Sequence, residues 1–326
     1  MHYAFLSFGL TTGFRRVTAL SIPRRHLWRR ASSLAILAGL LFVPRPWECN
    51  AAQPSEASER SPAPVAASEQ LPKAIDLRSA FQQWELAPRR QGGRPTCSAF
   101  VVAGALEFAV AKRQGHGTRL SVEFLNWAAN KECGDTNDGG FFSDLWKGFA
   151  THGICTEEGM PYQARLDSAQ PPSTAALADA KTRLALGLRL HWIKEWNVKT
   201  GLTDDQFMAI KRTLSQGWPV GGGLRWPKQA QWTNDVLQMC PADAVYDGHS
   251  ILLVGYREDP AQPGGGVFIF RNTSGNGRDG YMPYAYAQTY MNDAVWVDYE
   301  AQSKRPTASV APFSQGADNT SAQSSR

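Results

Sequence analysis

A cysteine, a histidine and an asparagine occur in an order that fits nucleophilic catalysis. Cys97 opens an apolar segment, His249 enters a run typical of a buried strand, and Asn272 ends the next such run. A thiol, an imidazole and an amide in this order can act as nucleophile, base and orienting group. A cysteine by itself is more often buried and inert, so the prediction depends on the three residues together.

The surroundings of Cys97 suit a reactive thiol. A free thiol titrates near pH ~8.5 and is mostly protonated at neutral pH. Cys97 stands at the start of a predicted helix, where free N–H groups and a partial positive charge stabilise a thiolate. The preceding loop begins at Gln91, whose side-chain amide can donate toward the same point. The other histidines beyond the first 52 residues lack such a setting: His116 is expected to be exposed, and His152 and His191 to be structural.

The elements that must position these residues change in character along the chain. Before about residue 175 the apolar residues recur with helical spacing, and helices are predicted at 97–112, 121–130 and 140–151. Afterwards, a helix at 204–216 precedes predicted strands at 218–226, 250–256, 267–270 and 294–298, which Gly- and Pro-rich turns separate. Helices first and strands later predict an α+β protein with two lobes and a cleft between them.

Both ends of the chain differ from this predicted domain, which spans residues 73–301. Residues 1–52 hold seven arginines, a single acidic residue and an apolar run of 13 residues, which is typical of a signal peptide or an N-terminal anchor. Residues 53–72 and 302–326 are poor in bulky apolar residues, which predicts a flexible linker and a disordered tail. A secreted or periplasmic location is therefore expected, with no stable membrane insertion once the leader is cleaved.

Charge and motif content argue against several classes of function. Beyond the leader the chain has 27 basic and 28 acidic residues, so a nucleic-acid partner is not expected. Residues 275–280 match G-x-G-x-x-G, but no amphipathic helix is predicted after them, which argues against dinucleotide binding. Neither C-x-x-C nor H-E-x-x-H occurs, so no metal site is predicted.

Several short stretches together resemble the papain family of cysteine peptidases. The stretch 91–100, in which Cys97 stands six residues after a glutamine, resembles the family's nucleophile motif. Residues 137–140 resemble the turn that borders the substrate cleft, and residues 248–256 resemble the strand of the catalytic histidine. Residues 271–281 resemble the stretch that carries the family's asparagine. Together with weaker matches, these cover most of the predicted domain in the family's order.

The resemblance implies a papain-like fold, with a helical lobe and an antiparallel β-barrel-like lobe on either side of the active-site cleft. It also implies a monomeric peptidase that acts on peptides or proteins and needs no cofactor. Cys97 would attack a peptide carbonyl as a thiolate paired with protonated His249, which Asn272 would orient. Gln91 and the Cys97 backbone N–H would form the oxyanion hole. The expected substrate-binding residues are Gly139, Gly140, Phe141 and Gly248. Phe141 and Phe142 are expected to line the pocket for the second residue before the scissile bond, which suggests a small or restricted pocket.

Two tryptophans of the family's pattern are missing. Ser98 directly follows the nucleophile and Ser274 follows Asn272 by two residues, and the family usually has tryptophan at both positions. The second tryptophan normally shields the hydrogen bond between histidine and asparagine from water. Three functions therefore stay open: an active peptidase, another thiol acyl-transfer enzyme such as a peptide ligase or an amidase, and a non-catalytic peptide-binding module. The presence of all four site residues favours the first.

One disulfide of the family's pattern is also missing. Arg94 and Asn137 stand where the family has the two paired cysteines, so neither position leaves an orphan thiol. Cys133 and Cys155 flank the third predicted helix and are expected to form a different bridge, because an exported protein tolerates disulfides. Cys240 would then be free.

Overall fold

The computed structural model describes residues 70–165, 170–275 and 277–300 of the chain. The predicted signal peptide or anchor (1–52), most of the predicted linker (53–72) and the predicted tail (302–326) lie outside the described residues. The expected α+β architecture is confirmed in the part that is described. None of the helices there combines the length and the hydropathy that a membrane span requires.

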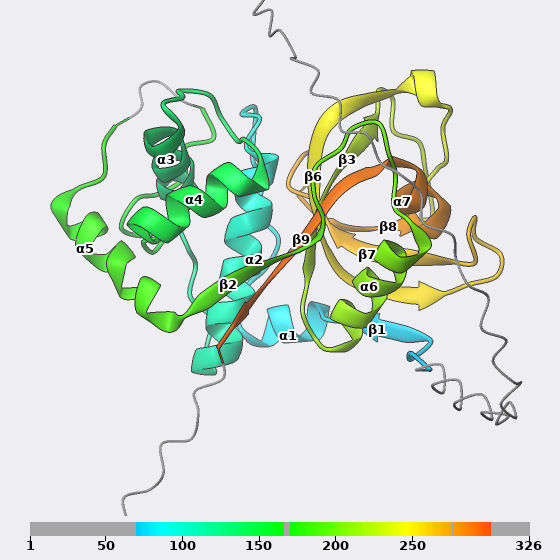
Figure 1. Ribbon diagram of the computed structural model, residues 1–326, viewed down its shortest axis with the longest axis horizontal. Coiled ribbons are helices and arrows are strands. Elements are labelled where there is room, and N and C mark those ends of the chain that lie inside the picture. Colours follow the sequence, from blue (N-terminus) through cyan, green and yellow to red (C-terminus); the bar gives the residue numbers. More distant parts are fainter. Residues whose placement is uncertain (1–69, 166–169, 276, 301–326) are drawn as a thin grey trace, which may run out of the picture. The chain divides into compact units, whose positions relative to one another are not determined.

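Helices make up one lobe (Figure 1). They are α1 (Arg78–Gln83), α2 (Cys97–Gln114), α3 (Val122–Cys133), α4 (Phe142–His152) and α5 (Thr174–Thr182), followed by a 3₁₀ turn at Leu184–Leu186. Helix α2 is buried on nearly all sides because it packs against α3, α4 and three strands of the sheet. Helix α3 begins where the Ser121 hydroxyl accepts a hydrogen bond from the Phe124 N–H at 2.9 Å. The central helix thus holds Cys97 at the junction of the two lobes.

A single sheet forms most of the other lobe (Figure 1). Its strands are β1 (Ala74–Asp76), β2 (Leu188–Lys194), β3 (Val220–Pro227), β4 (Trp232–Thr233), β5 (Val236–Leu237), β6 (Val245–Glu258), β7 (Gly266–Arg271), β8 (Asp279–Pro283) and β9 (Met291–Tyr299). The order is β2-β9-β3-β6-β7-β8-β5-β4, with β1 paired to β6. All pairs are antiparallel except β5 with β8. The antiparallel character is confirmed, but the path is open and does not close into a barrel.

The predicted strands correspond to β3, β6, β7 and β9, and the helix predicted at 204–216 is α6 (Asp204–Ser215). A 3₁₀ turn at Ala242–Ala244 precedes β6, and α7 (Tyr284–Tyr290) joins β8 to β9. Strand β6 starts five residues before the predicted run, so His249 lies inside the strand rather than at its entrance. There it pairs with Leu224 of β3. A histidine held in register by two strands has a fixed position relative to the cleft.

Three consecutive glycines let β3 pass close to its neighbours. A Cβ atom at Gly221 would lie 2.7 Å from a methyl group of Val101 in α2, and one at Gly222 would lie 2.7 Å from the Met291 methyl group. A Cβ atom at Gly223 would lie 2.2 Å from a carboxylate oxygen of Asp293. The glycines therefore allow α2 to sit directly on the sheet and leave room for a carboxylate beside the cleft.

Candidate active site

Cys97 is the first residue of α2, and it lies buried against a cavity of about 350 Å³. The same cavity is lined by Phe141 from the helical lobe and by Leu224 and His249 from the sheet. The predicted nucleophile and the predicted base thus reach one space from different lobes. The Cys97 Sγ lies 3.8 Å from the carbonyl oxygen of Gly248 and donates toward it. Within the described part of the chain, Sγ makes no hydrogen bond to the imidazole.

The predicted base and its orienting group come from adjacent antiparallel strands. His249 lies in β6, and Asn272 directly follows β7. The imidazole Nε2 lies 3.1 Å from Asn272 Oδ1, and the N–H and the hydroxyl of Ser274 each approach the same oxygen at 3.1 Å. Because a backbone N–H can only donate, this atom must be the amide oxygen, and Nε2 must carry the ring proton. Nδ1 is therefore the ring nitrogen that can accept a proton.

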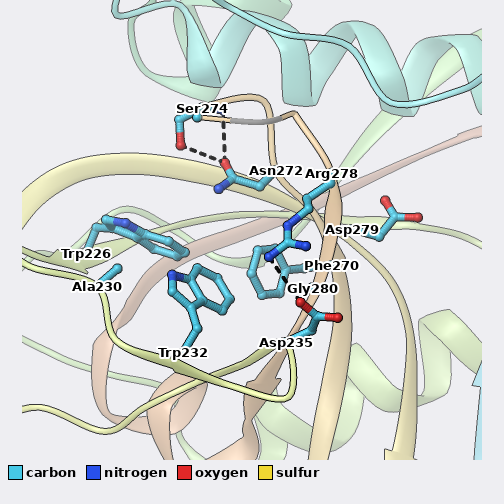
Figure 2. A pocket seen from close by; sticks show the side chains of 11 residues that line it. Trp226, Ala230, Trp232, Asp235, Phe270, Asn272, Ser274, Arg278, Asp279 and Gly280 are labelled. Carbon is cyan, nitrogen blue, oxygen red and sulfur yellow. Dashed lines mark hydrogen bonds and ion pairs between the residues drawn. The ribbon is translucent and has the colours of Figure 1, made fainter.

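A tryptophan from another strand covers the imidazole. Trp226 in β3 is buried, and its ring lies edge-on to the ring of His249, with 4.6 Å between the centroids. Figure 2 shows Trp226 and Trp232 beside a cavity of about 370 Å³ that Asn272 and Ser274 also line. The side chain of Ser274 is too small to fill this space. Trp226 thus supplies an indole at the histidine from a position outside the family's motif.

Burial favours the uncharged form of both predicted catalytic groups. It lowers the pKa of His249 to about 4, and the hydrogen bond to Asn272 offsets only part of this effect. Burial also raises the pKa of the Cys97 thiol more than the hydrogen bonds from Ser250 and Ser98 lower it. Both shifts therefore favour a neutral thiol and a neutral imidazole in the free site. They act against the thiolate–imidazolium pair that the resemblance implied, because burial disfavours both charges, and that pair stays a prediction.

Gln91 is buried beside the orienting asparagine. Its Oε1 accepts a hydrogen bond from the Thr273 hydroxyl at 2.7 Å, and its backbone N–H donates to the Thr273 carbonyl oxygen at 2.9 Å. Its Nε2 donates to the carbonyl oxygen of Arg94 at 2.9 Å. An amide nitrogen has two protons, and the Arg94 carbonyl takes one of those of Gln91. Gln91 is not among the residues that line the cavity of Cys97, so its predicted place in the oxyanion hole stays a prediction.

Three of the four predicted substrate-binding residues line the cavity of the nucleophile, namely Gly140, Phe141 and Gly248. Gly139 is not among the lining residues, and it adopts a φ of +79°. A Cβ atom at Gly139 would lie 2.6 Å from the carbonyl oxygen of Pro95. The Gly139 N–H donates to the side chain of Asn126 at 2.8 Å. Its role is therefore to let the turn approach the loop before Cys97.

Ion pairs occupy the place of the missing disulfide. Arg94 is 5% exposed, and its guanidinium pairs with Glu123 of α3 and with Asp138, at 2.7 Å from Asp138 Oδ1. The same Asp138 oxygen accepts a hydrogen bond from the side chain of Asn126 at 3.2 Å. The two carboxylates raise the pKa of the guanidinium further above its ordinary value. This buried cluster (Arg94, Glu123, Asp138) joins the loop before the nucleophile to the turn at Gly139.

The predicted disulfide between Cys133 and Cys155 is wrong, because the structure leaves both as free thiols. Cys155 is buried in a small cluster that includes Phe124 and Ala128, and burial raises its pKa to about 11. Cys133 lies exposed at the end of α3, on the surface rather than in that cluster. Cys240 is also free, as expected.

The other histidines and the glycine-rich match noted in the sequence do not belong to the site. His116 is exposed, as expected, while His152 and His191 pair with Glu132 and Asp298 at 2.9 Å each. The stretch after Gly275 continues into β8 and not into a helix, which removes the structural context for a dinucleotide. Sequence reasoning missed Trp226 and Asp293 at the cleft. The available signal for Asp293 was a polar pair, 292–293, inside an otherwise apolar run.

Similarity to known proteins is present in both sequence and structure. The family model for the papain family cysteine proteases matches residues 71–298. Xylellain, a cysteine protease from Xylella fastidiosa, has a similar solved structure (TM-score 0.55, 21% identity, 71% of this chain and 88% of that chain).

Two further solved structures are similar over comparable lengths. They are digestive procathepsin L 3 of Tenebrio molitor larval midgut (TM-score 0.51, 20% identity, 72% of each chain) and the major ragweed pollen allergen Amb a 11, a cysteine protease, in its proform (TM-score 0.51, 18% identity, 73% of this chain and 69% of that chain). At these identities the likeness shows the fold. No curated protein gives a significant match.

Proposed function

The chain belongs to the papain family of cysteine proteases, and on this premise we propose that it hydrolyses peptide bonds with Cys97 as nucleophile and His249 as acid and base. The observation that carries the proposal is the fixed tautomer of His249, which leaves Nδ1 free as a proton acceptor. The shared cavity supports it, because Sγ and the imidazole both line the same space. A site without chemistry has no need for this combination.

Because burial favours the neutral form of both groups, His249 acts as a general base in the proposed mechanism. As a substrate carbonyl enters the cavity, Sγ attacks its carbon while Nδ1 takes the thiol proton. The negative charge then moves to the carbonyl oxygen, where the Cys97 N–H at the helix start and the free amide proton of Gln91 stabilise it. One such donor contributes about 3 kcal/mol to the transition state. The C–N bond breaks, the imidazolium returns its proton to the leaving amine, and a thioester remains on Cys97.

Water completes the reaction by the same groups in reverse order. Nδ1 of His249 takes a proton from water, whose oxygen attacks the thioester carbon. The C–S bond breaks, the thiolate regains the proton from the ring, and a carboxylic acid leaves. Asn272 holds the ring through both steps, because its oxygen is fixed by two donors of Ser274.

Covalent labelling of the full chain tests this proposal. A thiol-reactive epoxide inhibitor of papain-type enzymes is added at pH 7, and mass spectrometry locates the adduct. Stoichiometric labelling at Cys97 that is lost in His249→Ala is expected, since the thiol depends on the base. Cys155 serves as the internal control, because it is buried and its pKa is raised to about 11. Labelling of Cys97 that is unchanged in His249→Ala would refute the assignment.

A non-catalytic peptide-binding protein on the same scaffold is the second candidate. It is favoured by the contact of Sγ with the Gly248 carbonyl oxygen in place of the imidazole. The two candidates differ in turnover: a peptidase releases a fluorophore from peptidyl amides, whereas a binding protein holds the same peptides without releasing it.

We also propose that the chain is exported. The basic and apolar leader in residues 1–52 supports this proposal. Expression of the full chain in a bacterium that has a periplasm, followed by N-terminal sequencing, tests it. A mature protein that starts near residue 52 is expected, and retention of the leader in a cytoplasmic fraction would contradict it.

A further inference from the structure

A carboxylate that the proposed mechanism does not use lies beside the cleft. Asp293 in β9 is 4% exposed, and one of its oxygens accepts a hydrogen bond from the Gly223 N–H at 2.6 Å. The other oxygen forms no hydrogen bond or ion pair with the described residues. Asp293 also lines the cavity of Cys97. No enclosed polar side-chain atom of the described residues lacks a hydrogen-bond partner, so this second oxygen is reached by solvent. A ligand in the cavity that Asp293 lines can therefore donate to it.

The space around Asp293 is acidic. A second cavity of about 550 Å³ adjoins the first, and the two share Phe141, Trp196 and Asp293. The carboxylates that line one or both cavities are Asp138, Asp247, Glu195 and Asp293, and no lysine or arginine lines either. Asp138 is neutralised by Arg94 in the buried cluster, but the other three form no ion pair with the described residues. The combined cavity therefore attracts positive charge.

The groups that face Asp293 leave its charge without a cation. The charge of Lys194 in β2 lowers the pKa of Asp293 from a distance. The ammonium group itself donates to the Thr200 hydroxyl at 3.1 Å and makes no ion pair within the described part of the chain. The negative charge of Asp247 in β6 raises the pKa of Asp293. Burial raises the pKa of Asp293 to about 6, so the carboxyl is ionised at neutral pH. The place of a counter-ion is thus open in the free protein.

Aromatic rings stand at the entrance to the same space. Phe141 and Trp196 are 49% and 45% exposed, and their rings meet edge to face with 5.2 Å between the centroids. The faces of exposed aromatic rings attract cations and also pack against aliphatic chains. Lysine and arginine side chains carry an aliphatic stem and a cationic end. Rings at the entrance and a carboxylate inside match both parts of such a side chain.

We propose that the cleft recognises a lysine or arginine side chain of the substrate, with Asp293 as the specificity-determining carboxylate. The aromatic rings alone would suit any large side chain, and the open carboxylate oxygen selects the cation among them. Gly223 is required for this arrangement, because any side chain at that position would collide with the Asp293 carboxylate. The substrate class rests on the proposed peptidase function, whereas the recognition of the cation does not.

Matched peptides test the selectivity on the full chain. Fluorogenic peptidyl amides carry arginine, citrulline or leucine two residues before the scissile bond, and citrulline has the shape of arginine without its charge. The ratio of kcat/KM for arginine over citrulline is expected to be about tenfold or more, as for a charge-assisted hydrogen bond to a buried group. In Asp293→Asn the ratio is expected to fall to near one, because asparagine keeps the acceptor for Gly223 but has no charge.

A charge-matched control separates this contact from the general charge of the protein. Glu158→Gln removes a carboxylate that is exposed and lines neither cavity, and it is expected to keep the ratio of the unmodified chain. A ratio near one in the unmodified chain overturns the proposal, and so does a high ratio that Asp293→Asn leaves unchanged. If Asp293→Asn does not fold, the unmodified chain still tests the proposal, because a ratio near one overturns it.

Binding to Cys97→Ala distinguishes this inference from the peptidase function. Fluorescein-labelled arginine and citrulline peptides are titrated with the variant, and fluorescence anisotropy reports the two Kd values. If the unmodified chain hydrolyses no peptide and its Cys97 is not labelled, the peptidase function fails. Binding of the arginine peptide to Cys97→Ala that is about tenfold tighter than that of the citrulline peptide would still support the role of Asp293. Equal binding of both peptides, or binding of neither, overturns the inference whatever the peptidase result.

Discussion

Replacing Arg94 with methionine is expected to destabilise the fold substantially. The guanidinium lies 5% exposed between the carboxylates of Glu123 and Asp138, whose side chains are 8% and 13% exposed. Methionine fills much of the same volume but leaves two buried negative charges without a cation. Breaking a buried pair in this way costs about 3–5 kcal/mol. That is a large part of the roughly 5–15 kcal/mol that stabilises an ordinary domain.

Urea denaturation followed by tryptophan fluorescence measures this free energy of unfolding. Arg78→Met is the matched control, because Arg78 pairs with Asp76 at the surface, where the side chains are 35% and 43% exposed. An exposed pair contributes about 0–1 kcal/mol, so the control is expected to remain close to the unmodified protein.

A third variant tests the reason for the loss. Adding Glu123→Gln and Asp138→Asn to Arg94→Met removes the stranded charges, and more than half of the lost stability is expected to return. The reasoning would be refuted if Arg94→Met cost no more than Arg78→Met, or if neutralising both carboxylates recovered nothing. Either result would mean that the buried cluster (Arg94, Glu123, Asp138) does not replace the missing disulfide.

Four other predictions follow from the site. Trp226→Ala is expected to lower kcat about tenfold and to move the acid limb of the pH profile to higher pH. Water would then reach the imidazole of His249, whose pKa burial lowers to about 4. Trp226→Phe is expected to restore part of the lost kcat and part of the shift of the acid limb. Alkylation of Cys97 by iodoacetamide, followed by mass spectrometry, is expected to rise continuously from pH 6 to 9, since burial raises the pKa of the thiol, and a plateau at acidic pH would contradict the neutral pair. The preference for arginine over citrulline is expected to weaken as the pH falls from 7.5 to 5, because Asp293, with its pKa raised to about 6, loses its charge; a constant ratio would count against its role. Finally, alkylation of the unfolded chain without reductant is expected to label both Cys133 and Cys155. If neither is labelled until a reductant is added, the two cysteines do form the predicted disulfide.

The sequence alone determined the elements that local patterns encode. The periodic apolar residues after Cys97 predicted α2, and the continuous apolar run after His249 predicted the buried part of β6. Helix periodicity and strand burial depend on neighbours in the chain, so they can be recognised without tertiary contacts. The order of Cys97, His249 and Asn272 was equally visible, and the structure brings the latter two together by pairing β6 with β7.

Only the tertiary structure decided what surrounds these residues. The partners of Arg94 come from positions 29 and 44 residues away, and no local pattern indicates that an ion pair replaces a disulfide there. Trp226 reaches the imidazole because β3 lies beside β6. The pKa of Cys97 is raised and the pKa of His249 is lowered because both groups are buried, and burial is a property of the whole packed lobe. Asp293 fits beside β3 because Gly223 has no side chain, and the Gly223 N–H binds one of its two oxygens. Such a backbone approach exists only after the chain has folded.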